Sequence, residues 1–138
     1  MPATAPLRAA DIMNSDLRTC SVFSSVLEAA MIIREVDCGI VPVVEGGRAV
    51  GLLTDRDIVL GLTDDPDVTS RPVADVMTKE VVSVGPETPL DAVLARLRDQ
   101  GLRRLLVIDG DRLVGIISHD DIVRHINAQD LDRPRRAR

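Results

Sequence analysis

Two pairs of residues combine a hydroxyl group with an acid three positions later: Thr54 with Asp57, and Ser118 with Asp121. Each pair precedes an apolar stretch, which is the pattern of a capping box, so a helix is expected to begin at each place. The helix dipole keeps an aspartate in the first turn ionised, and an ionised carboxylate only accepts hydrogen bonds. The spacing therefore suits a ligand with O–H donors. Alternatively, the pairs are capping boxes alone, each stabilising its helix by about 1 kcal/mol.

Each pair lies in a longer motif, and the chain contains this motif twice. Residues 51–60 read GLLTDRDIVL and residues 115–124 read GIISHDDIVR. A glycine followed by two aliphatic residues is typical of the end of a buried strand, where a missing side chain lets another backbone or a ligand approach closely. The motif therefore predicts a strand, a tight turn and a helix, in two copies.

The elements that position these motifs repeat as well. Ala-Asp-Ile-Met at residues 10–13 is matched by Ala-Asp-Val-Met at residues 74–77. Ser25 and Thr88 are expected to cap amphipathic helices, and glycine-containing turns between apolar runs predict two β-hairpins. Each half is thus expected to read strand, helix, strand, strand, helix, with strands at 19–22, 40–44, 49–53, 81–84, 105–108 and 113–117. The last helix of each half is expected at 55–62 and 120–128.

The organisation predicted from this repeat is a single α+β domain. A half of ~60 residues is only marginally stable alone, so the halves are expected to pack as a pseudo-twofold pair. The boundaries expected are 8–62 for the first repeat and 72–128 for the second, with a connecting loop at 61–72. Residues 129–138 are expected to form a disordered basic tail.

Composition excludes several classes of function. The net charge of −5 and the near absence of aromatic residues argue against nucleic-acid binding. No apolar run approaches the ~20 residues that span a bilayer, and the start lacks a signal pattern, so a cytoplasmic protein without membrane contact is expected. Cys20 and Cys38 do not form a CxxC motif, and a disulfide between them is left open.

No catalytic or metal-binding constellation is apparent in the sequence. It shows no nucleophile with an adjacent base, no metal-ligand cluster and no P-loop. His119 and His125 lack a third ligand at a useful spacing. We therefore expect no enzyme and no required cofactor.

The doubled order of elements resembles the CBS (cystathionine-β-synthase) domain pair, or Bateman module, over residues 8–128. The matching motifs are Gly-x-x-Thr/Ser-x-x-Asp after the third strand of each half, Asp-Ile-Met at 11–13, Asp-Val-Met at 75–77 and Val-Pro-Val-Val at 41–44. The resemblance is to small stand-alone bacterial members. It implies a regulatory module that binds AMP, ATP, NAD or S-adenosylmethionine in the cleft between repeats and forms homodimers.

Carried over by this resemblance, each hydroxyl and acid pair forms a ribose and phosphate site. Ribose is expected on the acid, and phosphates toward the hydroxyl and its basic neighbour, Arg56 or His119. Histidine is only partly charged near neutral pH, so the second site is expected to hold phosphates less firmly unless Arg103 and Arg104 compensate. The complete ribose and phosphate set is Thr54, Arg56 and Asp57 in the first half, and Ser118, His119 and Asp121 in the second.

The resemblance also implies a flat apolar slot for adenine in each half. Its expected walls are Cys20, Val22, Ile40, Val41 and Pro42 in the first half, and Ser83, Val84, Leu105 and Leu106 in the second. Because Leu106 stands where the first half has Pro42, the first site is expected to be the better formed.

Two functions follow as hypotheses. One is a sensor that binds an adenosine compound and passes a conformational change to a separate effector protein, since a ligand shifts an equilibrium by its differential affinity for two states. The other is a dimerisation or assembly module that needs no ligand. The sequence leaves open which adenosine compound binds, whether one site or both are filled, and which partner is regulated.

Overall fold

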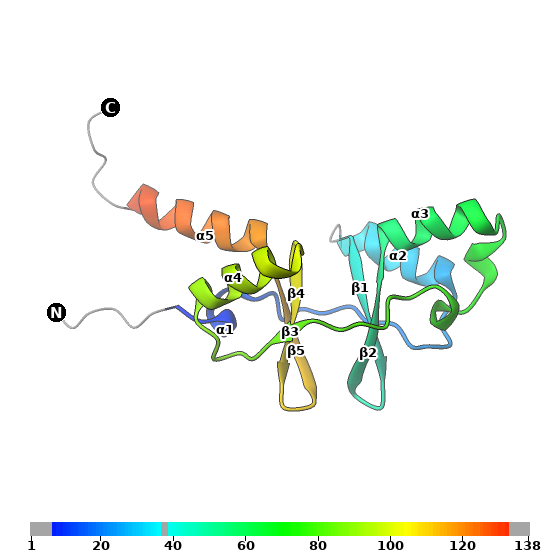
Figure 1. The fold of residues 1–138 in the computed structure, drawn as a ribbon, viewed down its shortest axis with the longest axis horizontal. Coiled ribbons are helices and arrows are strands. Elements are labelled where there is room, and N and C mark those ends of the chain that lie inside the picture. Colours follow the sequence, from blue (N-terminus) through cyan, green and yellow to red (C-terminus); the bar gives the residue numbers. More distant parts are fainter. Residues whose placement is uncertain (1–6, 37–38, 133–138) are drawn as a thin grey trace. The chain divides into compact units, whose positions relative to one another are not determined.

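The computed structural model describes residues 7–36 and 39–132, with side chains up to residue 126. Figure 1 shows the helices α1 (Ala9–Ile12), α2 (Val26–Val36), α3 (Asp55–Asp64), α4 (Leu90–Gln100) and α5 (His119–Asp132). The strands are β1 (Ile40–Glu45), β2 (Arg48–Thr54), β3 (Ser83–Val84), β4 (Arg104–Asp109) and β5 (Arg112–Ser118). Two 3-10 turns lie at Val68–Ser70 and Val73–Asp75. The predicted α+β class is confirmed.

The chain divides into two compact units that do not coincide with its sequence halves. The first unit contains residues 17–81 and 111–113, and the second contains residues up to 16, 82–110 and from 114 onward. Each unit therefore includes the segment that precedes the first strand of the other half. This leading segment is residues 72–81 in the first unit and the residues up to 16 in the second. In the first unit the N–H of Thr78 donates to the carbonyl of Leu52 at 2.8 Å, and in the second the N–H of Asn14 donates to Ile116 at 2.8 Å.

The core of the first unit lies between the β1–β2 hairpin and helix α2. The two strands are antiparallel, with Ile40 opposite Thr54 and Glu45 opposite Arg48. Glycines Gly46 and Gly47 make the turn with positive φ angles of 60° and 83°. The buried cluster consists of Cys20, Val26, Ala29, Val41, Val43, Leu53 and Val73. Aliphatic side chains from elements distant in sequence therefore hold this unit together.

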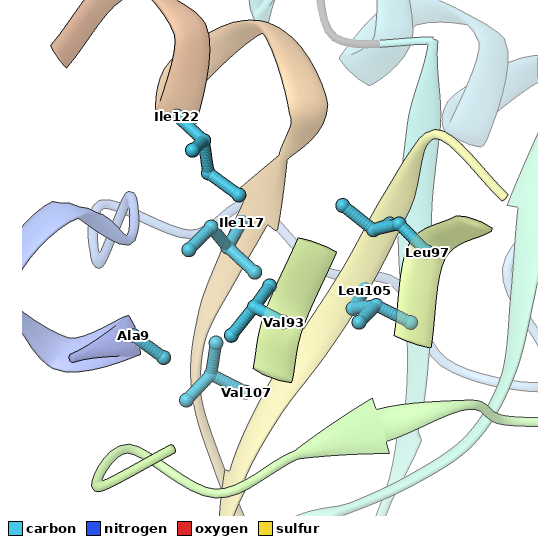
Figure 2. Packing of buried hydrophobic residues seen from close by; sticks show 7 residues of the cluster. All are labelled: Ala9, Val93, Leu97, Leu105, Val107, Ile117 and Ile122. Carbon is cyan, nitrogen blue, oxygen red and sulfur yellow. The ribbon is translucent and has the colours of Figure 1, made fainter. Parts of the chain in front are cut away.

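The core of the second unit is built from five elements (Figure 2). Its sheet has the order β3-β4-β5, and β3 runs parallel to β4. The buried residues are Ala9 from α1, Val93 and Leu97 from α4, Leu105 and Val107 from β4, Ile117 from β5, and Ile122 from α5. Ala9, from the N-terminal segment, is 0% exposed, so this segment is part of the second unit's core.

Two local predictions about strands and caps are corrected by the structure. The strand expected at 19–22 reduces to one bridge between Cys20 and Val43, because a turn begins at once and Ser24 donates to the carbonyl of Ser21 at 3.1 Å. Helix α4 is not capped by Thr88. Its N-cap is Pro89, which has no side-chain cap.

Other boundaries shift toward longer helices. Helix α3 continues to Asp64, and a 3-10 turn occupies part of the expected connecting loop. Helix α5 continues to Asp132, so residues 129–132 are helical and not part of a disordered tail. Residues 133–138 and Cys38, and with it the disulfide question, lie outside the described residues. In the described part of the chain, no helix has the length and apolar character needed to cross a membrane.

Candidate functional site

Both predicted capping boxes are present. The hydroxyl of Thr54 accepts the N–H of Asp57 at 3.0 Å, and the carboxylate of Asp57 accepts the N–H of Thr54 at 3.0 Å. In the second unit the N–H of Asp121 donates to the Ser118 hydroxyl at 3.0 Å, and the N–H of Ser118 donates to the Asp121 carboxylate at 3.3 Å. Each acid is half-buried and fixed where a strand becomes a helix.

The carboxylate of Asp57 has a further partner that sequence reasoning missed. The hydroxyl of Thr78 lies 3.2 Å from both carboxylate oxygens and donates to them. Thr78 follows directly after Ala-Asp-Val-Met at residues 74–77, on the segment that pairs with β2. Gly51, at the start of the motif, predicted that another backbone or a ligand would approach closely. It did not show which segment of the chain this would be.

The carboxylate of Asp121 is occupied differently. Nη2 of Arg124, on the same helix, donates a hydrogen bond to Oδ1 of Asp121. The residue paired with Ile116 here is Asn14, whose Oδ1 accepts the N–H of Asp16 at 3.0 Å. Arg124 was also missed, although a basic residue three positions after an acid on one helix face is a recognisable pattern. One acid thus has a neutral hydroxyl donor, the other a cation.

The amide groups at the start of α3 already have acceptors within the protein. The N–H of Asp55 donates to the carbonyl of Gly39 at 3.1 Å, and the N–H of Arg56 donates to the Asp55 carboxylate at 2.8 Å. The third amide, of Asp57, is taken by Thr54. A phosphate at this end would meet the helix dipole but would have to compete for the amides.

The basic neighbours lie at the surface. Arg56 is exposed, and the side chain of His119 is 55% exposed, with Nδ1 3.8 Å from a carboxylate oxygen of Asp120. Arg103 lies 3.7 Å from the other oxygen of Asp120, and its carbonyl accepts the N–H of His119 at 2.9 Å. Arg104 is the first residue of β4. The structure thus brings Arg103 and His119 together at the start of α5.

The residues expected to form the first adenine slot separate into two groups. Cys20 and Val41 belong to the buried core cluster, and the half-buried Val22 packs against it. Ile40 and Pro42 are buried outside that cluster. Because side chains alternate along a strand, Val41 faces the core while its two neighbours face the other side of β1.

The second slot shows the same division. Leu105 is part of the core cluster, whereas Leu106 is 1% exposed and lies outside it. Ser83 and Val84 are half-buried on β3, where Ser83 pairs with Leu106 and Val84 with Val107. Ser83 and Leu106 therefore lie side by side on neighbouring strands.

The thiol of Cys20 is buried, with 8% exposed surface. Burial, and to a smaller degree the negative charge of Glu28, raise the pKa of this thiol from its ordinary 9.0 to about 11. A thiol with a raised pKa stays protonated near neutral pH and is a poor nucleophile. Cys20 is therefore suited to packing and not to covalent chemistry.

An acidic hollow of about 260 Å³ begins at Asp57 and follows α3. Arg71 lies 3.0 Å from a carboxylate oxygen of Asp75 and 3.5 Å from one of Asp65. The hydrogen bond with Asp75 is the main cause of a raised pKa at Arg71. The lining residues are Asp57, Leu60, Gly61, Asp64, Asp65, Val68, Arg71, Asp75 and Val76. Four carboxylates face one guanidinium, so this hollow disfavours a polyphosphate.

The described residues contain no cluster of metal ligands. No three His, Cys, Asp or Glu side chains there are arranged to hold a metal ion.

Comparison with known proteins places the chain in a family. The CBS domain matches residues 9–64 and again residues 73–128. The CBS domain-containing protein YhcV of Bacillus subtilis is 36% identical over 112 residues, which are 81% of this chain and 80% of YhcV. The two stretches that match the CBS domain include both capping-box motifs.

Two solved structures have a similar fold. The crystal structure of Hypoxic Response Protein I with two coordinated zinc ions has a TM-score of 0.77 and 32% identity, covering 86% of this chain and 98% of that chain. The CBS domain pair of protein MJ0100, in complex with 5'-methylthioadenosine and S-adenosyl-L-methionine, has a TM-score of 0.81 and 25% identity, covering 91% and 99%. The chain therefore belongs to the CBS domain family and carries that domain twice.

Proposed function

We propose that the protein is a cytoplasmic regulatory module that binds an adenosine-containing ligand and passes a conformational change to a separate effector protein. The observation that supports the proposal best is the pair of half-buried carboxylates, Asp57 and Asp121, each held by a capping box at the end of a strand. The relative MJ0100 binds two adenosine compounds through a CBS pair. We propose no catalytic activity for the chain.

In the proposed complex a ribose diol donates to the carboxylate of Asp57 or Asp121. A carboxylate offers about four acceptor positions, and the capping-box bond at each acid uses one of them, so the capping box itself leaves acceptor positions for a ribose diol. Thr54 and Ser118 hold the acids in place, while Arg56 and His119 lie beside them for phosphate groups. The proposed adenine contacts are Ile40 and Pro42 in the first unit and Ser83 and Leu106 in the second, because these residues lie outside the core clusters.

The candidate ligands differ in charge, and this difference leads us to expect a different preference at each site. The four carboxylates of the acidic hollow lie on the Asp57 side, so we expect the first site to prefer AMP or S-adenosylmethionine over ATP. The second site has Arg124 and Arg103 nearby, so NAD or ATP fits better there.

Isothermal titration with AMP, ATP, NAD and S-adenosylmethionine tests this function. Wild type is compared with Asp57→Asn and Asp121→Asn, which keep the shape of the side chain and remove its charge. Asp99→Asn, an exposed acid on α4, is the matched control for the charge change. We expect each site variant to abolish binding at its own site and Asp99→Asn to bind as wild type. Unchanged affinity in both site variants contradicts the assignment.

A second function, assembly without a ligand, is favoured by one surface. Phe23, Leu27 and Met31 are 84%, 52% and 54% exposed, and the last two lie one turn apart on α2. In the second half Asp91 and Ala95 occupy the places of Leu27 and Met31 on α4. A homodimer through α2 would cover these apolar side chains.

Sedimentation velocity separates the two functions. An assembly module remains a dimer with and without AMP, and Leu27→Asp converts it to a monomer. Asp91→Leu, placed on the corresponding position of α4, serves as the control. A monomer in the wild type excludes the assembly function.

A further inference from the structure

The hydroxyl of Thr78 lies between the two carboxylate oxygens of Asp57. Its oxygen is equidistant, at 3.2 Å, from the two carboxylate oxygens, so its single hydrogen is shared between them. A vicinal diol that bridges a carboxylate with two O–H donors approaches from the same direction, between the two oxygens. The Thr78 hydroxyl and such a diol would use the same acceptor positions of Asp57.

We propose that Thr78 is a competitor built into the first site, and that a bound ribose displaces its hydroxyl from Asp57. This inference rests on the proposed function of ligand binding. Residues up to 81 belong to the first unit, and residues 82–110 belong to the second, so the chain passes from one unit to the other just after Thr78. Thr78 is therefore a positioning residue for this connecting segment.

The bond from Thr78 to Asp57 is one of three that hold this segment to the first motif. The other two join its backbone to Leu52, with the Thr78 N–H donating at 2.8 Å and the Leu52 N–H donating to the Thr78 carbonyl at 2.9 Å. A hydroxyl bonded to an ionised acceptor is the stronger kind of side-chain hydrogen bond. Ligand binding therefore breaks the hydrogen bond between the Thr78 hydroxyl and Asp57, and the segment is then held to the first motif by its two backbone hydrogen bonds.

The second site has a different arrangement in the described residues. Asn14 makes the corresponding backbone pair with Ile116, at 2.8 and 3.0 Å. Its side chain accepts the N–H of Asp16, and Asp121 is bonded to Arg124 of its own helix. A ligand on Asp121 would displace an arginine and leave the leading segment untouched. The first site is thus the one that transmits ligand binding to the connecting segment.

Titration with AMP in an Asp121→Asn background, which isolates the first site, tests the competition. Thr78→Val keeps the branched shape and removes the donor, so we expect it to bind AMP about tenfold more tightly, the gain for one hydrogen bond to a charged group. Thr78→Ser restores the donor and should bind as the background protein. Asn14→Ala, at the corresponding place in the second unit, should also leave the affinity unchanged. Equal or weaker binding by Thr78→Val overturns the competition.

Hydrogen exchange without ligand tests this hydrogen bond separately. The amides of residues 52 and 78 should exchange several-fold faster in Thr78→Val than in Thr78→Ser, since one of three bonds is lost. Unchanged exchange rates at these two amides would show that the Thr78 hydroxyl does not hold the segment, whatever the result of the AMP titration. If neither the background protein nor Thr78→Val binds AMP or S-adenosylmethionine, both ligand binding at the first site and the proposed competition are rejected. Faster exchange in Thr78→Val would still support the hydrogen bond between Thr78 and Asp57 as a bond that holds the segment.

Discussion

Met77 covers Gly51 so closely that a Cβ atom on the glycine would lie 2.8 Å from the methionine sulfur. The carbonyl oxygen of Thr78 would lie at the same distance. Gly115 has the same relationship with Met13, whose side chain fills the space beside it. The glycine that opens each motif is therefore required by the leading segment of the other half.

Gly51→Ala should lower the free energy of unfolding by about 1–3 kcal/mol, as expected for an overpacked site. The backbone at Thr78 is held by two hydrogen bonds and cannot move away cheaply. Urea unfolding measures the effect. Gly85→Ala is the control, because a Cβ there would have its nearest contact at 3.8 Å.

Gly115→Ala should also be destabilising, but a second substitution should relieve it. The atoms nearest to its Cβ all belong to the side chain of Met13. Met13→Ala should therefore recover part of the loss in Gly115→Ala, whereas Met77→Ala should recover less in Gly51→Ala because the Thr78 carbonyl remains. Equal recovery in both pairs would contradict this packing.

Thr54→Ala should cost about 1 kcal/mol of stability, because the N–H of Asp57 loses its acceptor. Thr54→Ser retains the hydroxyl and should be near wild type. Thermal or urea unfolding of the three proteins provides the comparison. Equal stability of the alanine and serine variants would show that the cap contributes nothing.

The raised pKa of Cys20 predicts a loss of stability in alkali. Between pH 9.0 and about 11 the thiol of the unfolded chain is ionised while the buried thiol keeps its proton. The unfolded state then binds fewer protons, so the free energy of unfolding falls as pH rises through this window, by at most about 1.4 kcal/mol per pH unit, and levels off above it. Below pH 9 the thiol contributes no pH dependence.

Unfolding curves from pH 8 to 11.5 test this effect with little interference. The chain has no tyrosine, and Lys79 is its single lysine. Cys20→Ala should flatten the pH dependence, while Cys38→Ala should retain the part due to Cys20. A slope that survives in Cys20→Ala would assign the effect to another group.

Local signals predicted most of the fold. Both capping boxes, the two hairpin turns and the left-handed Gly101 at the end of α4 were predictable because each depends on residues close in sequence. The cap of α4 was predicted wrongly because Pro89 stands between Thr88 and the helix. Its fixed φ of −62° suits the N-cap position, and Thr88 uses its carbonyl to accept the N–H of Ala9.

The candidate site was less predictable than the fold. The positions of Asp57 and Asp121 followed from the motif, but their partners Thr78 and Arg124 did not. Thr78 reaches Asp57 through a strand pairing that depends on the whole fold. The sequence also did not show that Val41 and Leu105 face the core while their neighbours on the strand face the other side. A strand buried on both faces has no alternation of polar and apolar residues from which to predict this.

Because the two halves exchange their leading segments, a single repeat lacks part of its own folded unit. A chain with a single copy would present a β-hairpin without the segment that covers its glycine. Two such chains could complete each other only by trading segments, as in a domain-swapped dimer. Two copies on one chain make that exchange an intramolecular step at high effective concentration. Each unit then folds independently of how dilute the protein is.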